Sequence, residues 1–251
     1  MKRNYISYAV LLLAAIMVRP ALSSPESSAH YLANEGVMVA RGETKVLFDP
    51  LFRESFGQYD LVPPELEKAI FEGIPPFDGI DAVFISHSHD DHFDPALMKQ
   101  LLEEHRGIHL FAPAQAVAAL SEAGMEIDAR VHPVALANFD APVRIELGDL
   151  LVEAVRIPHG GWPERHRHVE NIAFRVTLDQ STTVVHLGDA DVDDGHFEKT
   201  AAYWAAGQPD LALPPFWFFY SEEGRRIVDE RIDAVHTIGI HVPTEVPDDP
   251  A

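Results

Sequence analysis

Cysteine is absent from the 251-residue sequence. Its absence excludes disulfide bonds, thiolate metal ligands, a thiol nucleophile and a lipid attached to cysteine. Any metal ion bound by this chain therefore depends on imidazole nitrogens and carboxylate oxygens. Both donor types suit zinc, so the lack of thiols does not exclude a zinc site.

Basic residues are also scarce. The chain has 19 Lys and Arg against 40 Asp and Glu, which gives a formal net charge of −21. Affinity for nucleic acids depends on basic side chains that neutralise phosphates, so we expect no nucleic-acid partner. Hydrophobic residues make up 47% of the chain, which is enough for a substantial core.

Long hydrophobic runs are confined to the first two dozen residues. Lys2 and Arg3 precede a short apolar run at residues 8–18, and small residues follow at 21–23. This order is typical of a secretory signal, so we predict a signal peptide at residues 1–23 and an exported protein, periplasmic or secreted. The alternative is an uncleaved membrane anchor, although the run is short for a bilayer. No other spanning segment is expected, and removing three basic residues moves the charge from −21 to −24.

Neither a repeat nor a long linker divides the remaining sequence, so we predict a single domain over residues 24–251. Strand patterns precede a region in which strands and helices alternate, which indicates two β-sheets packed together with helices outside. The expected strands are 30–40, 45–48, 80–85, 109–111, two within 143–157, 172–178, 182–187, 211–213 and 234–240. The expected helices are 65–71, 95–104, 113–123, 196–206 and 222–232.

The strongest chemical signal is the segment Ser86-His87-Ser88-His89-Asp90-Asp91-His92, directly after the predicted strand 80–85. Residues two apart at the end of a strand point to the same side, so His87 and His89 can bind one cation. The turn that follows can bring Asp91 and His92 to a second cation. The alternative is a solvated polar turn, but so many imidazoles and carboxylates rarely gather without a metal.

This segment resembles the H-x-H-x-D-H signature of hydrolases of the metallo-β-lactamase superfamily. The other motifs of that family follow in the same order, each at the end of a predicted strand: Asp49 in Phe48-Asp49-Pro50, His159, Asp189 in Gly188-Asp189, and His241. The resemblance covers nearly the whole chain after the signal. It implies an α/β (α+β) fold in which four layers form an αββα sandwich, with two mixed β-sheets and helices on the outer faces.

The resemblance also implies a site with two Zn²⁺ ions, for which Mn²⁺ or Fe²⁺ are alternatives. His87, His89 and His159 would bind the first ion, while Asp91, His92 and His241 would bind the second. Asp189 would bridge the two ions, and Asp49 would support the site. Each of the later residues could instead be an ordinary loop or surface residue, and three further histidines, His186, His196 and His236, lie near these motifs in the sequence.

Two such ions lower the pKa of a shared water and polarise the bond to be cleaved. We therefore predict a zinc-dependent hydrolase that uses a bridging hydroxide against an ester, lactone, amide or phosphodiester, with Asp91 orienting the hydroxide and taking up its proton. The pattern looks closest to the branch containing ascorbate-6-phosphate lactonase and N-acyl-phosphatidylethanolamine phospholipase D. Hydrolysis of β-lactams by a site of His and Asp alone, and a non-catalytic exported metal-binding protein, are the alternatives. A serine nucleophile is disfavoured because no G-x-S-x-G motif surrounds Ser86 or Ser88.

Three segments could shape a pocket for a small-molecule or lipid-like substrate. Residues 52–77 combine prolines with four aromatic residues and could form a lid, and residues 214–220 contain five aromatics in a row. The segment 214–220 could equally be core packing with a capped loop. Residues 162–168 are basic and could receive an anionic substrate group, or could be a plain solvated loop. The sequence leaves the oligomeric state open.

Overall fold

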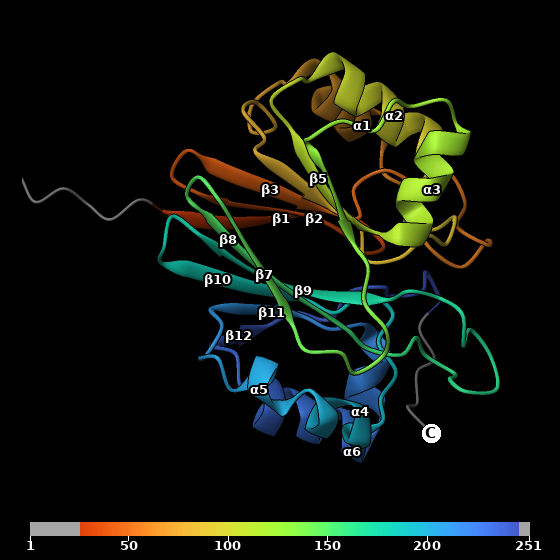
Figure 1. The fold of residues 1–251 in the computed structure, drawn as a ribbon, viewed down its shortest axis with the longest axis vertical. Coiled ribbons are helices and arrows are strands. Elements are labelled where there is room, and N and C mark those ends of the chain that lie inside the picture. The colour runs from red at the N-terminus through yellow and green to blue at the C-terminus, as the bar shows by residue number, and fades with distance from the viewer. Residues whose placement is uncertain (1–25, 246–251) are drawn as a thin grey trace, which may run out of the picture.

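Two six-stranded β-sheets lie face to face in the computed structural model, which describes residues 26–245 (Figure 1). The predicted signal peptide at residues 1–23 lies outside the described residues. Within residues 26–245, no helix has the length and apolar character needed to cross a membrane.

The first sheet has the strand order β1-β2-β3-β4-β5-β6. Its first three strands form antiparallel hairpins, and β3 to β6 run parallel to one another. The strands are β1 (Ser27–Ala33), β2 (Gly36–Arg41), β3 (Thr44–Phe48), β4 (Ala82–Phe84), β5 (His109–Pro113) and β6 (Val131–Val134).

The second sheet has the order β12-β11-β10-β9-β8-β7. Strands β7 to β10 pair antiparallel, whereas β10, β11 and β12 are parallel. The strands are β7 (Val143–Leu147), β8 (Leu150–Arg156), β9 (Ile172–Leu178), β10 (Thr182–His186), β11 (Leu211–Leu213) and β12 (His236–Thr237).

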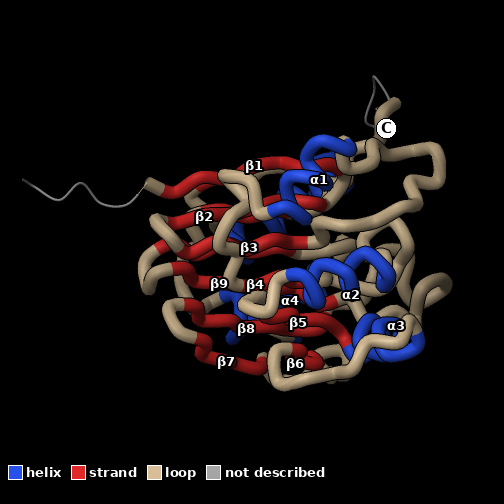
Figure 2. Tube along the Cα trace, turned by 90° about the horizontal axis from the view of Figure 1, so that it is seen from above, coloured by secondary structure: helices blue, strands red, loops and turns tan. Residues whose placement is uncertain are grey.

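Helices cover the outer face of each sheet, which confirms the predicted four-layer αββα arrangement (Figures 1 and 2). The first sheet carries α1 (Pro64–Glu72), α2 (Pro95–Glu104) and α3 (Ala114–Glu122). The second carries α4 (Asp194–Lys199), α5 (Ala201–Trp204), the 3₁₀ turn η1 (Phe216–Tyr220), α6 (Glu222–Arg226) and the π-helical turn η2 (Ile227–Ile232).

A buried aromatic cluster joins the two sheets. The Phe84 ring centroid lies 5.1 Å from that of Phe48, 5.0 Å from Phe111 and 5.2 Å from Phe174 in the facing sheet. All four side chains are fully buried, and each buried phenylalanine contributes about 2–3 kcal/mol through its removal from water. This packing fixes the two sheets relative to one another, and with them the loops at the ends of their strands.

Several element boundaries differ from the sequence prediction. The predicted strand 30–40 is a hairpin, because Asn34 adopts a left-handed backbone with φ of 47° and the chain turns at residues 34–35. Strand β6 was not predicted, since Pro133 interrupts its pattern. The predicted helix 196–206 is split at Thr200, whose hydroxyl donates to the His196 carbonyl oxygen.

The C-terminal elements also differ. The predicted helix 222–232 begins as α-helix and ends as a π-helical turn. The predicted final strand, residues 234–240, is reduced to the two residues of β12, since the chain at 238–240 follows the neighbouring segment through only one isolated bridge, between Pro215 and Ile240.

Candidate metal centre

The candidate ligands lie at the carboxyl ends of strands from both sheets. Asp49 follows β3, and the histidine cluster beginning at His87 follows β4 in the first sheet. His159 follows β8 and Asp189 follows β10 in the second. The helix that follows the cluster is anchored as predicted: the Asp94 carboxylate accepts hydrogen bonds from two backbone N–H groups at the start of α2, with Pro95 as its first residue.

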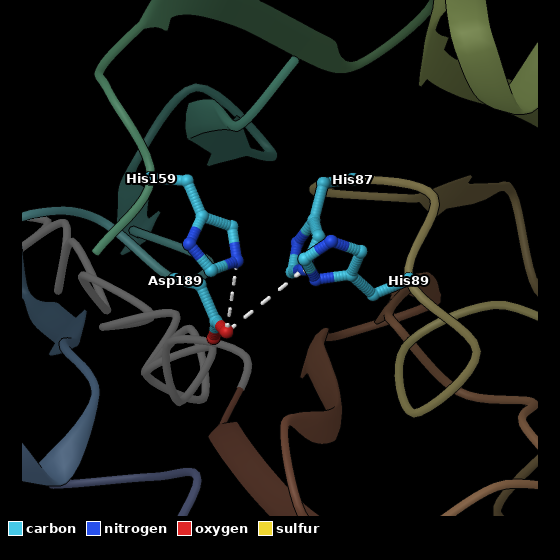
Figure 3. A group of neighbouring side chains, drawn as sticks. All are labelled: His87, His89, His159 and Asp189. Carbon is cyan, nitrogen blue, oxygen red and sulfur yellow. Dashed lines mark hydrogen bonds and ion pairs between the residues drawn. The ribbon is translucent and has the colours of Figure 1, made fainter. Parts of the chain in front are cut away.

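His87, His89, His159 and Asp189 form a first group in which one ligand atom of each lies within 4.8 Å of the others (Figure 3). Nε2 of His87 lies 3.1 Å from Nδ1 of His89 and 3.9 Å from Oδ2 of Asp189. Nε2 of His159 lies 3.2 Å from the same Asp189 oxygen. The residues expected at the first metal position therefore converge.

Asp91, His92 and His241 form a second group with the same spacing. Nε2 of His241 lies 3.5 Å from Oδ2 of Asp91, and Nε2 of His92 lies 3.8 Å from that oxygen. The structure thus brings together the residues expected at the second position as well.

Asp189 lies between the two groups and presents one carboxylate oxygen to each. Oδ2 faces His87 and His159, whereas Oδ1 lies 3.4 Å from Nε2 of His92 and 3.2 Å from Nε2 of His241. This is the arrangement expected of a carboxylate that bridges two metal ions.

The buried polar atoms of both groups fit a pair of cations. Four atoms that face the shared space have no hydrogen-bond partner: His92 Nε2, His159 Nε2, Asp189 Oδ1 and His241 Nε2. Buried polar atoms are seldom left unsatisfied, and imidazole with carboxylate is a donor set that binds zinc. The residues present therefore fit a two-metal site.

The electrostatics of the two groups differ. Burial lowers the pKa of His89 to about 4 and that of His87 well below its usual value, so both imidazoles are neutral and ready to bind a metal. Burial also disfavours a charged His241, but the adjacent Asp189 outweighs this effect and raises the pKa of His241 to about 10. The carboxylates beside the second group thus favour a protonated His241 when no metal is bound, whereas the first group favours neutral imidazoles.

A layer of hydrogen bonds holds the ligands in place. Asp49, expected to support the site, accepts from Ser86 N–H at 2.8 Å and lies 3.0 Å from Nδ1 of His92. Two asparagines that sequence reasoning missed complete this layer. The Asn34 side-chain amide donates to the Asp91 carbonyl oxygen at 2.9 Å, and the Asn34 backbone carbonyl accepts from His241 N–H. Oδ1 of Asn171 accepts from Asp189 N–H at 3.0 Å. Neither asparagine belongs to a motif, so no sequence signal distinguished them.

Sequence reasoning also missed Glu35, a fully buried carboxylate in the β1–β2 turn. Burial raises the pKa of Glu35 well above its usual value, although the nearby His92 opposes this shift. The only available signal was an acidic residue within an otherwise apolar hairpin.

The three alternative histidines lie outside both groups. His236 is exposed on β12. His186 is buried, and its Nε2 lies 3.2 Å from the Glu35 carbonyl oxygen. His196 is buried against the Phe139 and Trp162 rings. These positions agree with the expected choice of His241 over His236.

The three candidate pocket segments each reach the centre at one point. In residues 52–77, the Tyr59 ring lies 4.1 Å from that of His241. In residues 214–220, Trp217 lies 5.4 Å from the same ring, whereas Phe218 is core. In residues 162–168, the His166 ring lies 4.5 Å from that of His159. Aromatic rings therefore flank the second group, and an imidazole flanks the first.

Comparison with known proteins identifies the family. Residues 44–240 match a family described as the beta-lactamase superfamily domain, and this match covers most of the chain. The chain belongs to this superfamily.

One relative and two solved structures illustrate the similarity. Protein Rv0786c of Mycobacterium tuberculosis (strain ATCC 25618 / H37Rv) is 28% identical over 150 residues, which is 59% of this chain and 57% of that relative. The chain thus spans little more than half of the length of this curated relative.

The metallo-beta-lactamase fold protein YhfI from Bacillus subtilis is 19% identical with a TM-score of 0.56, and the match covers 87% of this chain and 82% of that one. The isothiocyanate hydrolase from Delia radicum gut bacteria is 14% identical with a TM-score of 0.59, and the match covers 85% of this chain and 84% of that one. Both similarities are of fold, and the fold is that of the metallo-β-lactamase superfamily.

Proposed function

We propose that this chain is a zinc-dependent hydrolase that cleaves an ester, lactone, amide or phosphodiester bond in a small-molecule or lipid-like substrate. The observation that carries the proposal is the position of Asp189, whose two oxygens face two separate groups of buried imidazoles. Zinc ions bound to these groups supply Lewis acidity and a water of lowered pKa. A site with this donor set needs no protein nucleophile.

Asp91 is the residue we assign to proton handling. Its carboxylate is buried and Oδ2 faces Nε2 of His241 at 3.5 Å, so one of its oxygens reaches the space where a water would react. A carboxylate at this place orients that water and takes up its proton until the leaving group accepts it. The Tyr59 and Trp217 rings lie against that of His241 on this side of the site.

The surroundings of the site favour an uncharged or weakly charged substrate with an apolar part. The Tyr59 and Trp217 rings offer an apolar flank beside the second group. The net charge of −21 opposes the approach of polyanions. Among the candidate substrates, these features favour esters and lactones.

We further propose that the chain belongs to the branch that contains ascorbate-6-phosphate lactonase and N-acyl-phosphatidylethanolamine phospholipase D. The early segment ending in Asp49-Pro50 and the late segment ending in His241 support this placement. The signal-like residues 1–23 support export to the periplasm or beyond, with residues 24–251 as a single domain. Mass spectrometry of the protein from the exported fraction tests the cleavage site.

The test of the activity compares the wild type with His87→Ala and with a control, His236→Ala, that removes an exposed histidine outside the candidate ligand groups. Purified protein is analysed for metal and assayed against p-nitrophenyl esters, lactones, β-lactams and bis-aryl phosphates. We expect two zinc ions per chain and turnover of esters or lactones that His87→Ala abolishes and His236→Ala retains.

Other outcomes separate the alternatives. Turnover of β-lactams alone would indicate an antibiotic hydrolase. Two bound ions with no turnover across the panel would indicate a metal-binding protein without catalysis. Turnover that survives both His87→Ala and removal of metal by a chelator would contradict a metal-dependent reaction.

A further inference from the structure

Glu35 is a buried carboxylate for which the centre described so far has no role. It lies in the turn between β1 and β2 and its exposed fraction is 0%. Neither Oε1 nor Oε2 has a hydrogen-bond partner. A buried carboxylate without partners is costly, so a proton or a metal ion must neutralise it.

The imidazoles closest to Glu35 already have other partners. Oε2 lies 3.7 Å from Nδ1 of His92, but this nitrogen is 3.0 Å from Asp49. Oε2 also lies 3.5 Å from Nε2 of His186, which is closer to the Glu35 carbonyl oxygen at 3.2 Å. Neither histidine therefore supplies the hydrogen bond that the carboxylate lacks.

Two ligand residues of the second position lie near the same carboxylate. Glu35, Asp189 and His241 each have a ligand atom within 4.8 Å of those of the other two. Two ligands that bind one ion at about 2.1 Å are at most about 4.2 Å apart. Glu35 is therefore near enough to this position to become a ligand if its side chain closes on an ion held by His241 and Asp189.

The charges of the centre support this reading. Glu35, Asp49, Asp91 and Asp189 are four buried carboxylates around one space. Two divalent ions carry four positive charges. The three aspartates balance three of these, and either a bound hydroxide or Glu35 supplies the fourth negative charge, so a fourth carboxylate is compatible with a two-metal site.

We propose that Glu35 is a metal ligand at the second position, where it adds a carboxylate to Asp91, His92, His241 and the shared Asp189. The inference rests on the proposed two-metal site and specifies its chemistry. The first position has three imidazoles and one carboxylate, whereas the second then has two imidazoles and three carboxylates. Because oxygen ligands suit Mn²⁺ and imidazoles suit Zn²⁺, the two positions differ in preference, and the second favours the harder ion.

Metal binding tests this inference without recourse to turnover. Full-length protein is stripped with a chelator and reloaded with one equivalent per chain of Zn²⁺ and one of Mn²⁺, so that Zn²⁺ cannot fill both positions. Bound metal is then counted by mass spectrometry and the Mn²⁺ environment is recorded by electron paramagnetic resonance. We expect one Zn²⁺ and one Mn²⁺ in the wild type. In Glu35→Gln, which keeps the shape and removes the charge, we expect Mn²⁺ to bind at least about tenfold more weakly while one Zn²⁺ remains.

Glu43→Gln is the matched control, because it makes the same change at an exposed position in the next hairpin turn. It should bind both ions as the wild type does. Circular dichroism shows whether Glu35→Gln folds. Its metal-free form should melt close to the metal-free wild type, since the neutral glutamine matches the size of a carboxyl group that a proton neutralises when no metal is bound.

A crystal structure of the loaded wild type provides a second test that needs no variant. We expect a Glu35 oxygen about 2.2 Å from the ion at the second position. Unchanged Mn²⁺ affinity in a folded Glu35→Gln protein, or a Glu35 carboxylate outside the coordination shell in the crystal, would overturn the inference. A wild type that binds no metal at all would instead contradict the proposed function, so the two failures can be told apart.

Discussion

Nδ1 of His92 lies 3.0 Å from Oδ2 of Asp49, and this contact turns Nε2 of the same ring toward Asp91 and Asp189. Asp49 is itself fixed, because the Ser86 hydroxyl donates to Oδ2 at 2.5 Å and the Ser86 N–H donates to Oδ1 at 2.8 Å. A residue at the end of β3 thus orients a candidate ligand that follows β4. Carboxylates that bind the far nitrogen of a metal-binding histidine also increase its strength as a ligand.

Replacement of Asp49 by Asn should therefore weaken metal binding although Asp49 reaches neither ion. The amide keeps the size of the side chain, but its N–H groups would face groups that now donate to Asp49, namely those of Ser86 and His92. We expect zinc affinity to fall about 10- to 100-fold, as measured by competition with a chromophoric chelator. Asp149→Asn, at an exposed position of the β7–β8 turn, is the control and should bind zinc normally. An Asp49→Asn protein with wild-type affinity would show that this contact has no role in ligand orientation.

The position of Asp189 between two groups predicts a pattern across three variants. Asp189→Ala should weaken the binding of both ions, because each oxygen of the Asp189 carboxylate faces one group. His159→Ala should lose the ion at the first position and His241→Ala the ion at the second, so each variant should bind one ion instead of two. Metal analysis after dialysis measures these values. Loss of only one ion in Asp189→Ala would contradict a bridging role.

Gly188 allows the close approach that positions Asp189. It has a left-handed backbone with φ of 53°, and an added Cβ would overlap Oδ1 of Asn171 and lie 2.6 Å from Cβ of Ser86. We expect Gly188→Ala to reduce the free energy of unfolding by about 3 kcal/mol, because both overpacking and the backbone conformation oppose the methyl group. Urea unfolding of the metal-free protein gives this value. Gly107→Ala is the control, because its Cβ would have no neighbour within 4 Å; equal stability of the two variants would contradict the prediction.

The layers of the fold and the convergence of the candidate ligands followed from the sequence because both depend on local patterns. Apolar runs of strand length ending in His or Asp place such residues at one edge of a sheet. The same reasoning did not find the turn at Asn34 and Glu35, since the apolar residues at 31–33 and 37–40 on either side give one continuous strand pattern. Strand β6 was missed because its exposed Pro133 looks like a strand breaker.

The residues that support the centre depend on contacts distant in sequence. Asn34 joins Asp91 to His241, and Asn171 holds the backbone of Asp189. Each has an ordinary sequence environment, so its role becomes visible only when the sheets are packed. Glu35 is predictable in one respect only, namely that a carboxylate within an apolar hairpin requires a partner.

The burial of His196, which belongs to neither candidate ligand group, predicts that the stability of the fold depends on pH. Its side chain is buried, and neither ring nitrogen has a hydrogen-bond partner. Burial lowers the pKa of His196 below its ordinary value of 6.5, although Asp193 and Asp191 oppose this effect. The unfolded chain therefore binds a proton more readily than the folded one as the pH falls below 6.5. The stability that the neutral ring contributes is fully present above that pH and is lost on acidification.

Replacement of His196 by Leu removes this titration and keeps an apolar side chain against the Phe139 and Trp162 rings. The melting temperature of the metal-free protein is measured with a chelator present at about pH 7.5 and at about pH 5, on either side of the ordinary histidine pKa. We expect a smaller decrease between these values in His196→Leu than in the wild type. His236→Gln, which changes an exposed histidine, should show the decrease of the wild type. If His196→Leu loses as much stability on acidification as the wild type does, His196 is not a source of the acid sensitivity.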